Sequence, residues 1–332
     1  MKKVVLQEFG GPEVLHWVDY PDPICPEDGW VVETRAIGLN FAEVVERRGQ
    51  YRRDQKTPYE MGKEASGIIC EKGPSAEGFE VGDAVIVVKF NNGCYGEKIS
   101  AVPGQVLLPP EGFSFAEMSS FANTWATAWL ALEEMGRVRP GESALIQAAA
   151  GGVGTAAVLL ARSLGMAPII GTAGTHEKCR LVESLGASRC VDYTSEDFRG
   201  TVTEITKGRG VDWCLESVGG EVYERSLESL GPTGRLVLIG FSSLSGDYSE
   251  QIPRLHPLTL FHRSISVSGL NVDKLDYPTL EGCWDSLVKH VNHHGLRPVI
   301  GPSFSFSDIV AAHTALESRN STGKVVLEVD AS

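Results

Sequence analysis

The sequence predicts an α/β protein with a doubly wound parallel sheet and a second, β-rich domain. Three observations support this prediction: a glycine-rich turn at 148–154, a strand–helix unit that repeats after it, and short strand-like runs before residue 120. Strands that alternate with helices of this length form parallel sheets, because each helix returns the chain to the same end of the sheet. The length of 332 residues also favours two domains.

The glycine-rich turn is the most informative segment of the chain. The apolar run Ser143–Gln147 leads into Ala148–Gly154, and a helical pattern follows. A strand, a glycine turn and a helix in this order bring backbone N–H groups and the positive end of the helix dipole to a dinucleotide pyrophosphate. Against the G-x-G-x-x-G pattern the chain has Ala149, Gly151 and Gly154, so the first glycine is replaced. An ordinary tight strand–helix turn is the alternative.

The strand–helix unit recurs through the next part of the chain. Such a sheet binds its cofactor across the carboxyl ends of the strands, so we expect binding residues where the strands end. The predicted strands are 143–147, 168–172, 189–192, 211–216, 235–240 and 264–269, and the predicted helices are 155–164, 175–185, 195–206 and 221–230.

The end of the second of these strands bears on which nicotinamide cofactor binds. An NAD enzyme places an Asp or Glu there, about 20 residues beyond the glycines, to accept the ribose hydroxyls. This chain has no acid at that point. Instead Thr172, Gly174 and Thr175 offer hydroxyl and backbone donors, and Lys178 follows one turn into the helix. A lysine there can reach a 2′-phosphate, so the sequence predicts NADP(H), with a solvated surface lysine as the alternative for Lys178.

Composition argues against several classes of partner. The formal net charge of −13 repels nucleic acid and anionic membrane surfaces, and no apolar run approaches the length of a membrane span. The seven cysteines are scattered singly without a C-x-x-C pair, as in reduced thiols of a cytoplasmic protein. No local grouping of Cys and His predicts a metal site. We expect a cytoplasmic protein without metal, nucleic acid or membrane as a partner.

The β-rich region begins the chain, and the chain returns to it at the end. Strand-like runs near residues 4, 30, 68 and 85 are separated by turn signals, as in a small barrel. A helical pattern at 279–293 and a closing strand at 323–329 follow the strand–helix repeats. The expected domains are residues 1–122 with 271–332, and residues 123–270.

Four segments point to a known family: Gly38–Glu43, Gly62–Gly67, the turn with its preceding Gly141-Glu142, and Gly323–Val326. With these segments the whole chain resembles the zinc-free medium-chain dehydrogenases/reductases of the quinone oxidoreductase (zeta-crystallin) family. Zinc-binding members of the superfamily carry a cysteine near Asn40 and a histidine just before Glu64. The resemblance implies a GroES-like catalytic domain, a Rossmann domain that binds NADP(H), and no zinc.

The resemblance and the strand-end argument together predict the cofactor contacts. These lie in the glycine turn, at the strand ends and in the closing motif. The predicted residues are Asn40, Thr127, Ala150, Gly151, Gly152, Val153, Gly154, Thr172, Gly174, Lys178, Tyr193, Ser217, Gly240, Phe241, Ser242, Gly269, Leu270 and Lys324. Two departures from the family pattern are Leu159, where Gln is usual, and Trp129, where Tyr is usual.

The implied chemistry is NADPH-dependent, zinc-independent hydride transfer to a small electrophilic acceptor, a quinone or an α,β-unsaturated carbonyl. Such acceptors need mainly orientation over the nicotinamide and a donor for the developing oxyanion. The candidate catalytic residues are Asn40, which could hold the carboxamide or polarise the acceptor oxygen, and Tyr51 and Tyr95 as proton or hydrogen-bond donors. An exposed loop tyrosine is the alternative for Tyr51.

Two other functions stay open. A basic run of Arg47, Arg48, Arg52, Arg53 and Lys56 could attract the phosphates of coenzyme A, which would make an enoyl thioester on coenzyme A or an acyl carrier the acceptor. Solvated loop charges are the alternative for this run. The chain could also be an NADPH-binding structural or adaptor protein with little turnover, because a fold does not fix a function.

The last predicted strand of the sheet bears on assembly. Ser264–Gly269 is apolar on alternate residues and falls at the predicted sheet edge. An open edge can pair with the same edge of a second copy, and members of the family pair in this way. The sequence and the resemblance therefore predict a homodimer.

Overall fold

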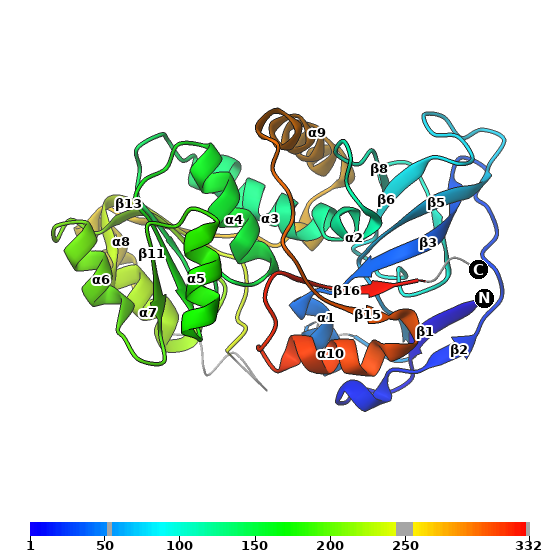
Figure 1. The fold of residues 1–332 in the computed structure, drawn as a ribbon, viewed down its shortest axis with the longest axis horizontal. Helices are drawn as coiled ribbons and strands as arrows, with labels where there is room; N and C mark the ends of the chain where they lie inside the picture. Colours follow the sequence, from blue (N-terminus) through cyan, green and yellow to red (C-terminus); the bar gives the residue numbers. More distant parts are fainter. Residues whose placement is uncertain (52–54, 244–254, 330–332) are drawn as a thin grey trace. The chain divides into compact units, whose positions relative to one another are not determined.

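The structure is a computed structural model that describes residues 1–51, 55–243 and 255–329. It divides into two compact units. The β-rich unit comprises residues 1–126 and 272–332, and the parallel-sheet unit comprises residues 127–271. Each unit has its own cluster of buried apolar side chains. A parallel sheet of the Rossmann type and a GroES-like β-rich unit (Figure 1) confirm the predicted fold class.

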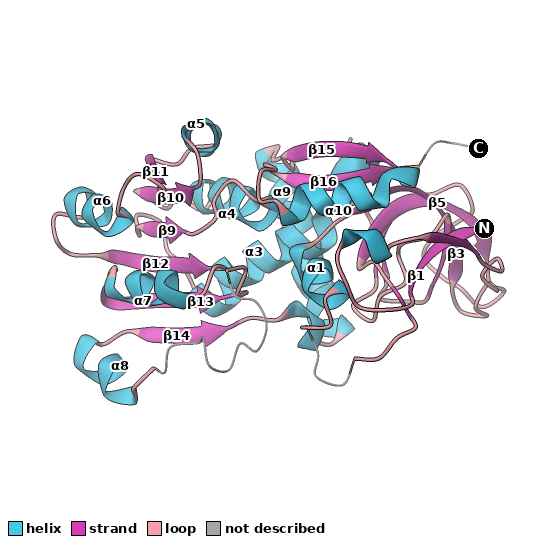
Figure 2. Cartoon of the chain, turned by 90° about the horizontal axis from the view of Figure 1, so that it is seen from below, coloured by secondary structure: helices cyan, strands magenta, loops and turns pink. Residues whose placement is uncertain are grey.

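Six parallel strands form the parallel-sheet unit, in the order β11-β10-β9-β12-β13-β14. Figure 2 shows these strands side by side. The first strand in sequence, β9, lies inside the sheet, and the strand order reverses between β9 and β12. The strands are β9 Ala144–Ile146, β10 Ile169–Ala173, β11 Arg189–Asp192, β12 Val211–Glu216, β13 Leu230–Leu238 and β14 Ser266–Gly269.

Helices connect these strands, and burial follows position in the sheet. All residues of the inner strands β9 and β12 are buried, as expected for strands covered on both faces, whereas the edge strand β14 is partly exposed. The predicted helix at 155–164 begins earlier, at Gly152. The helices are α3 Ala126–Leu130, α4 Gly152–Ser163, α5 His176–Ser184, α6 Phe198–Ile205, α7 Gly220–Glu228 and α8 Pro257–Arg263.

The β-rich unit holds two sheets, in the orders β15-β16-β3-β5-β6-β8, with β7 paired to β3, and β2-β1-β4. The closing strand β16 pairs with β3, so the end of the chain lies in the β-rich unit. The elements are β1 Lys2–Leu6, β2 Trp17–Asp19, β3 Trp30–Gly38, α1 Phe41–Arg47, β4 Tyr59–Glu60, β5 Glu64–Lys72, β6 Ala84–Val88, β7 Lys98–Ala101, β8 Val106–Leu107, α2 Phe115–Met118, α9 Tyr277–His294, β15 Ile300–Ser305, α10 Ile309–Glu317 and β16 Lys324–Glu328.

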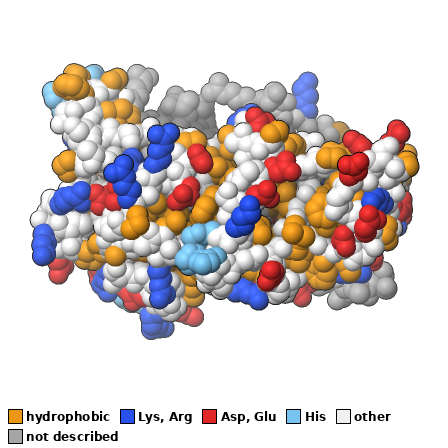
Figure 3. Space-filling model, turned by 90° about the horizontal axis from the view of Figure 1, so that it is seen from above, with side chains coloured by type: hydrophobic (Ala, Val, Ile, Leu, Met, Phe, Trp, Pro, Cys, Tyr) orange, Lys and Arg blue, Asp and Glu red, His pale blue; other side chains and the backbone are white. Residues whose placement is uncertain are grey.

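The surface charges and the hydropathy of the helices bear on possible partners. On the face drawn in Figure 3, both basic and acidic side chains are present among apolar and uncharged ones. Within the described part of the chain, no helix combines the length and the apolar character that a bilayer crossing requires.

Candidate functional site

The glycine-rich turn joins β9 to α4 at the carboxyl end of an inner strand. Ala148 adopts the left-handed conformation, with φ of 50°, so an alanine makes the tight turn although the first glycine of the pattern is missing. Gly151 is the N-cap of α4 and provides no side-chain cap. The first N–H groups of a helix have no carbonyl partner within it. The turn therefore offers backbone donors to an anion.

Two glycines of the turn have different surroundings. A methyl group at Gly154 would lie 2.6 Å from Ala149 Cα, so glycine is needed there for helix and strand to pack closely. At Gly151 the same methyl group would meet only the Ala148 carbonyl oxygen, at 3.4 Å. The space beside the start of α4 is therefore open, and a pyrophosphate of a dinucleotide fits this arrangement.

Most of the predicted cofactor residues gather at one edge of the parallel sheet. Parallel strands end at the same edge, so loops far apart in sequence are brought together. The predicted residues at this edge are Ala150, Gly151, Gly152, Val153 and Gly154 after β9, Gly174 and Lys178 after β10, Tyr193 after β11, Ser217 after β12, Gly240, Phe241 and Ser242 after β13, and Gly269 and Leu270 at the end of β14.

Gly174, Lys178 and Tyr193 lie together beyond β10 and β11. A Cβ atom at Gly174 would lie 2.8 Å from the Tyr193 hydroxyl oxygen, so glycine allows the tyrosine ring to approach the backbone. Tyr193 is 54% exposed. The Lys178 N–H donates to Thr175 Oγ1 at 3.2 Å at the start of α5, and burial lowers the pKa of the Lys178 ammonium. An exposed aromatic ring and a nearby cation could hold the adenosine end of a phosphorylated dinucleotide.

Thr172 is not placed as the sequence predicted. It is buried, its hydroxyl donates to Gln147 Oε1 at 2.6 Å, and its Oγ1 accepts the Ala148 N–H at 3.3 Å. The hydroxyl therefore braces the glycine turn from inside the sheet and is not presented to a ligand. Other predicted contacts are also buried: Asn40, Thr127, Ala150, Gly154, Leu270 and Lys324.

Asn40 begins α1 in the β-rich unit, and its side chain is enclosed by polar partners. Its Nδ2 donates to the Gly38 carbonyl oxygen at 3.3 Å and to Glu64 Oε1 at 3.1 Å. Its Oδ1 accepts from Lys324 Nζ at 2.6 Å, and Lys324 Nζ also donates to Glu64 Oε1 at 2.6 Å. The structure thus joins two predicted residues, Asn40 and Lys324, through Glu64.

Sequence reasoning named Glu64 only as a marker of the family and gave it no role. Glu64 is fully buried, and its second oxygen accepts the Asn123 N–H at 2.9 Å. Glu64 begins a strand, and the residues that follow it are the small Ala65, Ser66 and Gly67. A carboxylate in such a segment indicates a buried charge. A buried charge needs partners from elsewhere in the fold.

Glu43 supports the backbone on both sides of this cluster. Its carboxylate accepts the Asn40 N–H at 2.7 Å, the Lys63 N–H at 2.8 Å and the Tyr95 hydroxyl at 2.7 Å. Burial raises the pKa of the Glu43 carboxyl to about 7, although the Asn40 N–H and the Tyr95 hydroxyl favour its charged form. This carboxyl therefore titrates near neutral pH.

Tyr95 is not placed as a proton donor to an acceptor molecule. It is fully buried, its hydroxyl donates to Glu43, and its oxygen lies 3.1 Å from His313 Nε2. Burial and the negative charge of Glu43 raise the pKa of Tyr95 well above its usual value. The prediction of a donor role for Tyr95 is corrected by this burial, which a single sequence does not show.

Tyr51 shares a carboxylate with a buried lysine. Its hydroxyl donates to Asp273 Oδ2 at 2.9 Å, and Lys63 Nζ donates to the same oxygen at 2.6 Å. Lys63 Nζ also lies 3.1 Å from Glu46 Oε1 and 5.0 Å from the centroid of the Tyr51 ring. The hydroxyl hydrogen of Tyr51 is thus donated to Asp273. Tyr51 could donate this hydrogen to another molecule only after breaking its hydrogen bond to the Asp273 carboxylate.

The basic run is partly consumed by an internal ion pair. Arg47 is fully buried, and both Arg47 and Arg48 pair with the carboxylate of Glu317 on α10. Arg52 and Arg53 lie outside the described residues. Two of the cations that were expected to attract an anionic acceptor therefore already share one internal carboxylate.

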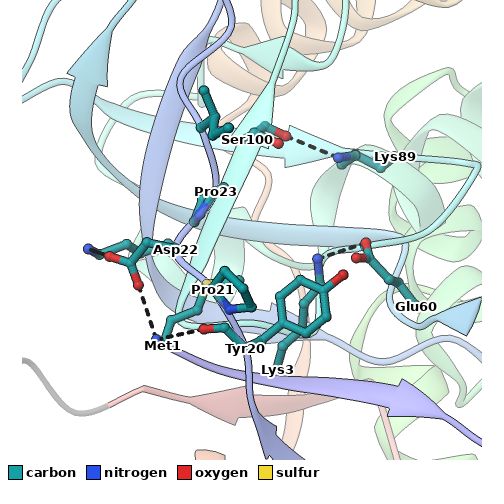
Figure 4. Close-up of a pocket in the computed structure, with 12 residues that line it drawn as sticks. Met1, Lys3, Tyr20, Pro21, Asp22, Pro23, Glu60, Lys89 and Ser100 are labelled. Atoms are coloured by element: carbon teal, nitrogen blue, oxygen red, sulfur yellow. Dashed lines mark hydrogen bonds and ion pairs between the residues drawn. The ribbon is translucent and has the colours of Figure 1, made fainter.

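A polar cavity of about 230 Å³ in the β-rich unit contains none of the predicted site residues (Figure 4). Its charged groups have partners in the cavity wall: Lys3 pairs with Glu60 at 2.7 Å, the Met1 amino group pairs with Asp22 at 3.0 Å, and Lys89 donates to the uncharged Ser100 carbonyl oxygen at 3.0 Å. Across residues 1–51, 55–243 and 255–329, no three His, Cys, Asp or Glu side chains are grouped so that they could hold a metal ion.

Comparisons with known proteins agree with this architecture. Family models described as the alcohol dehydrogenase GroES-like domain and zinc-binding dehydrogenase match residues 26–127 and 152–288. A quinone oxidoreductase of Pseudomonas aeruginosa is 31% identical over 329 residues, which cover 98% of this chain and 99% of that protein. The chain belongs to the quinone oxidoreductase family of medium-chain dehydrogenases/reductases. The predicted family is confirmed.

Two further relatives are similar to at least nine-tenths of this quinone oxidoreductase family member. The crystal structure of Escherichia coli quinone oxidoreductase complexed with NADPH is 28% identical, with a TM-score of 0.89, and the match covers 99% of this chain and 100% of that one. A phenolphthiocerol/phthiocerol polyketide synthase protein of Mycobacterium tuberculosis is 32% identical over 303 residues, which cover 90% of this chain but 13% of that protein.

Gly151→Ala and Gly154→Ala separate the two roles of the turn glycines. Gly151→Ala should leave the free energy of unfolding within about 1 kcal/mol of wild type and weaken NADPH binding by about tenfold or more, because the methyl group occupies the open space. Gly154→Ala should lower the free energy of unfolding by about 1–3 kcal/mol, because it overpacks the helix against the strand. Denaturant unfolding and fluorescence titration with NADPH check both. The reverse assignment of the two effects would contradict the prediction.

Glu43→Gln tests the buried carboxyl. The folded pKa is about 7 and the ordinary value is 4.5, so the folded state binds the proton more tightly, and stability falls as pH rises from about 4.5 to about 7. Above about pH 7, the contribution of the Glu43 carboxyl to the free energy of unfolding no longer depends on pH. The difference in free energy of unfolding between wild type and Glu43→Gln should change across the window and level off above pH 7, measured by denaturant unfolding from pH 4.5 to 8. A difference independent of pH would show that Glu43 does not titrate there.

Proposed function

We propose that this chain is an NADPH-dependent, zinc-independent oxidoreductase that reduces quinones. The observation that carries the proposal is the open space at Gly151 beside the unpartnered N–H groups of α4, in a chain of the quinone oxidoreductase family. The E. coli relative crystallised with NADPH supports the choice of cofactor. When bound, NADPH supplies the hydride from C4 of its nicotinamide.

The chain's own residues bind and orient this cofactor in the proposal. The N–H groups at the start of α4 bind the pyrophosphate, and Lys178 with Tyr193 holds the 2′-phosphate and the adenine side. The loops after β13 and β14 hold the nicotinamide end, and Asn40 is kept as a proposed cofactor contact on the ground of the family resemblance alone. The absence of an acid after β10 favours the phosphorylated cofactor.

The hydrogen bonds of the two tyrosines favour quinones over enones. A quinone that accepts a hydride becomes a hydroquinone anion, whose oxygen takes a proton directly from water. An enone that accepts a hydride becomes an enolate, which must be protonated on carbon, and a positioned acid accelerates that step. Tyr51 and Tyr95 both donate their hydroxyl hydrogens to carboxylates. We therefore infer that quinones are the better acceptors and that α,β-unsaturated carbonyls are reduced more slowly.

Enoyl thioester reduction is the second candidate. A polyketide synthase carries its growing chain as a thioester, and one such protein contains the segment similar to nearly all of this chain. The pairing of Arg47 and Arg48 with Glu317 removes part of the support for it. Free coenzyme A thioesters would then depend on cations other than these two.

An acceptor panel tests the proposal. Loss of NADPH absorbance should be fastest with 1,4-benzoquinone and 9,10-phenanthrenequinone, slower with a cyclic enone, and slowest with crotonyl coenzyme A. Lys178→Met should reduce the preference for NADPH over NADH by about tenfold, the value of one charge-assisted contact. Turnover of the thioester alone would replace the proposal with the second candidate. Tight NADPH binding without turnover of any acceptor would favour a structural or adaptor role.

We also propose that two copies pair through β14. This strand is at the edge of its sheet, and the Leu270 N–H donates to the Leu238 carbonyl oxygen at 2.9 Å. Alternate amides of a strand face the same side, so the Val267 N–H faces away from β13. The preceding helix α8 exposes 76% of Phe261, an apolar surface that a second copy would cover.

Val267→Pro should convert the dimer to a monomer, because it removes an outward N–H from the pairing edge while the bonds to β13 come from the neighbouring amides. Sedimentation velocity at micromolar concentration checks both proteins, and circular dichroism confirms that the variant folds. A monomeric wild-type protein at that concentration would defeat the proposed dimer.

A further inference from the structure

A buried carboxylate lies at the carboxyl end of β12, inside the parallel-sheet unit. Glu216 is the last residue of this strand and is fully buried. Its Oε1 accepts the Val218 N–H at 2.6 Å and the Gly219 N–H at 2.7 Å, and its Oε2 accepts the Ser226 hydroxyl hydrogen at 2.9 Å. Burial raises the pKa of the Glu216 carboxyl, whereas these three donors favour its charged form.

A chain of buried hydrogen bonds runs from this carboxylate to the glycine-rich turn. Ser226 Oγ, on α7, accepts from Gln147 Nε2 at 2.9 Å. Gln147 Oε1 accepts the Thr172 hydroxyl hydrogen at 2.6 Å, and Thr172 Oγ1 accepts the Ala148 N–H at 3.3 Å. The side chains of Glu216, Ser226, Gln147 and Thr172, all buried, form the buried relay. It links β12 through α7 to the end of β9, to β10 and to the first residue of the turn.

The charge of Glu216 sets the direction of every bond in the buried relay. A carboxylate can only accept, so the Ser226 hydroxyl donates to it and accepts from Gln147. The NH2 group of Gln147 therefore faces Ser226, and its Oε1 faces Thr172. The Thr172 hydroxyl then donates to Gln147, which leaves its oxygen to accept the Ala148 N–H. Hydrogen bonds that all point one way polarise and strengthen one another.

The same carboxylate also supports the loops after β12 and β13. Its two bonds to backbone N–H groups fix the chain directly after β12. In that segment the Ser217 carbonyl oxygen accepts the Ser242 N–H at 3.0 Å, and the Val218 carbonyl oxygen accepts the Ser243 N–H at 2.9 Å. The loops after β9, β12 and β13 are therefore all held by Glu216, either directly or through a short chain of hydrogen bonds.

We propose that Glu216 is a positioning residue for NADP(H), which acts through the buried relay to hold the glycine-rich turn at a fixed spacing from the loops after β12 and β13. A dinucleotide crosses such a sheet with one half on each side of the point where the strand order reverses, and its pyrophosphate lies at the glycine turn. The reversal falls between β9 and β12, and the buried relay crosses it. The inference rests on the proposed function for its ligand. Glu216 is buried, so it acts through the backbone of the loops.

The test compares NADPH with adenosine 2′-phosphate, a fragment without the pyrophosphate and the nicotinamide half. In the proposed site this fragment reaches only Lys178 and Tyr193. Ser226→Ala cuts the buried relay and leaves the two backbone bonds of Glu216 in place. It should weaken NADPH binding by about tenfold, because a turn that keeps its binding geometry in about one molecule in ten binds with a tenth of the affinity, and change fragment binding by less than about twofold. Isothermal titration calorimetry supplies both dissociation constants.

Ser143→Ala is the matched control. Ser143 Oγ donates to the Asp212 carboxylate at 2.7 Å and accepts the Asp212 N–H at 3.1 Å. Like Ser226, this buried serine accepts one N–H and donates to one carboxylate of β12, but it lies at the amino end of the strands. The control variant should lower the thermal midpoint of unfolding as Ser226→Ala does, and leave NADPH affinity within about twofold of wild type.

Two variants of Thr172 test the other end of the buried relay, also in case Ser226→Ala does not fold. Thr172→Val keeps the shape of the side chain without the hydroxyl and should weaken NADPH binding by about tenfold. Thr172→Ser keeps the hydroxyl and should bind NADPH within about threefold of wild type. Thr172→Val added to Ser226→Ala should cause no further loss, because both changes cut the same relay.

Three binding results would overturn the proposal. Equal loss of NADPH and fragment affinity in Ser226→Ala would indicate a general loosening of the sheet. Additive losses in the double variant would indicate two separate effects on the cofactor. Unchanged NADPH affinity in Ser226→Ala and Thr172→Val, or an equal loss in Ser143→Ala, would remove the positioning role of Glu216.

Amide exchange without ligand keeps this inference separate from the proposed function. In 15N spectra of the wild-type protein the Ala148 N–H should exchange slowly with water, because Thr172 accepts it inside the sheet. Ser226→Ala should speed this exchange by about tenfold, and Ser143→Ala should not. Exchange as fast in wild type as in Ser226→Ala would refute the relay even if NADPH binds tightly. Exchange that depends on Ser226 in a protein that does not bind NADPH would refute the proposed function and leave the relay as a purely structural link.

Discussion

Buried charge must be compensated, and the β-rich unit is organised by that constraint. Glu43, Glu64, Lys63 and Lys324 are all buried there, and an unpaired ion in such surroundings costs several kcal/mol. Glu64 is compensated by Lys324, and Lys63 by Glu46 and Asp273. The pairs join the starts of β5 and β16, and the residue before β5, with the last turn of α1 and the residues after β14. Asn40 and Tyr51, the two predicted residues of this unit whose side chains lie among these pairs, take their orientation from the charges.

A different constraint organises the parallel-sheet unit. Its strands all run in one direction, so their loops meet at one edge, and the close approach of α4 to β9 at Gly154 fixes where that edge presents free N–H groups. Ala148 and Thr172 show that the turn is held mainly from inside: one adopts the left-handed conformation, and the other bonds the turn to the neighbouring strand. The site surface can then be bare backbone, which is what a phosphate requires.

Local pattern was enough to predict the parallel-sheet unit. Its strands and helices follow from apolar periods and glycine turns, and the parallel direction of the strands follows from the alternation of the two. The site in the β-rich unit was less predictable, because its contacts join distant parts of the chain. Lys324 lies 284 positions from Asn40, and Glu317 lies 270 positions from Arg47. Sequence alone therefore marked Arg47 as an exposed cation and Tyr95 as a free donor.

Compensation of buried charge also limits the chemistry that the site can perform. Each carboxylate that holds a neighbouring hydroxyl or amide hydrogen withdraws that hydrogen from catalysis: Asp273 from Tyr51, Glu43 from Tyr95, and Glu64 from Asn40. Tyr95 is fully buried, so among these side chains only Tyr51 and Asn40 remain as candidates to offer an acceptor oxygen atom. A site of this kind orients a cofactor well and protonates a carbon poorly. Such a site would suit acceptors whose reduced form is an oxygen anion that water can protonate, and this is the physical reason for which we propose quinones as the acceptors.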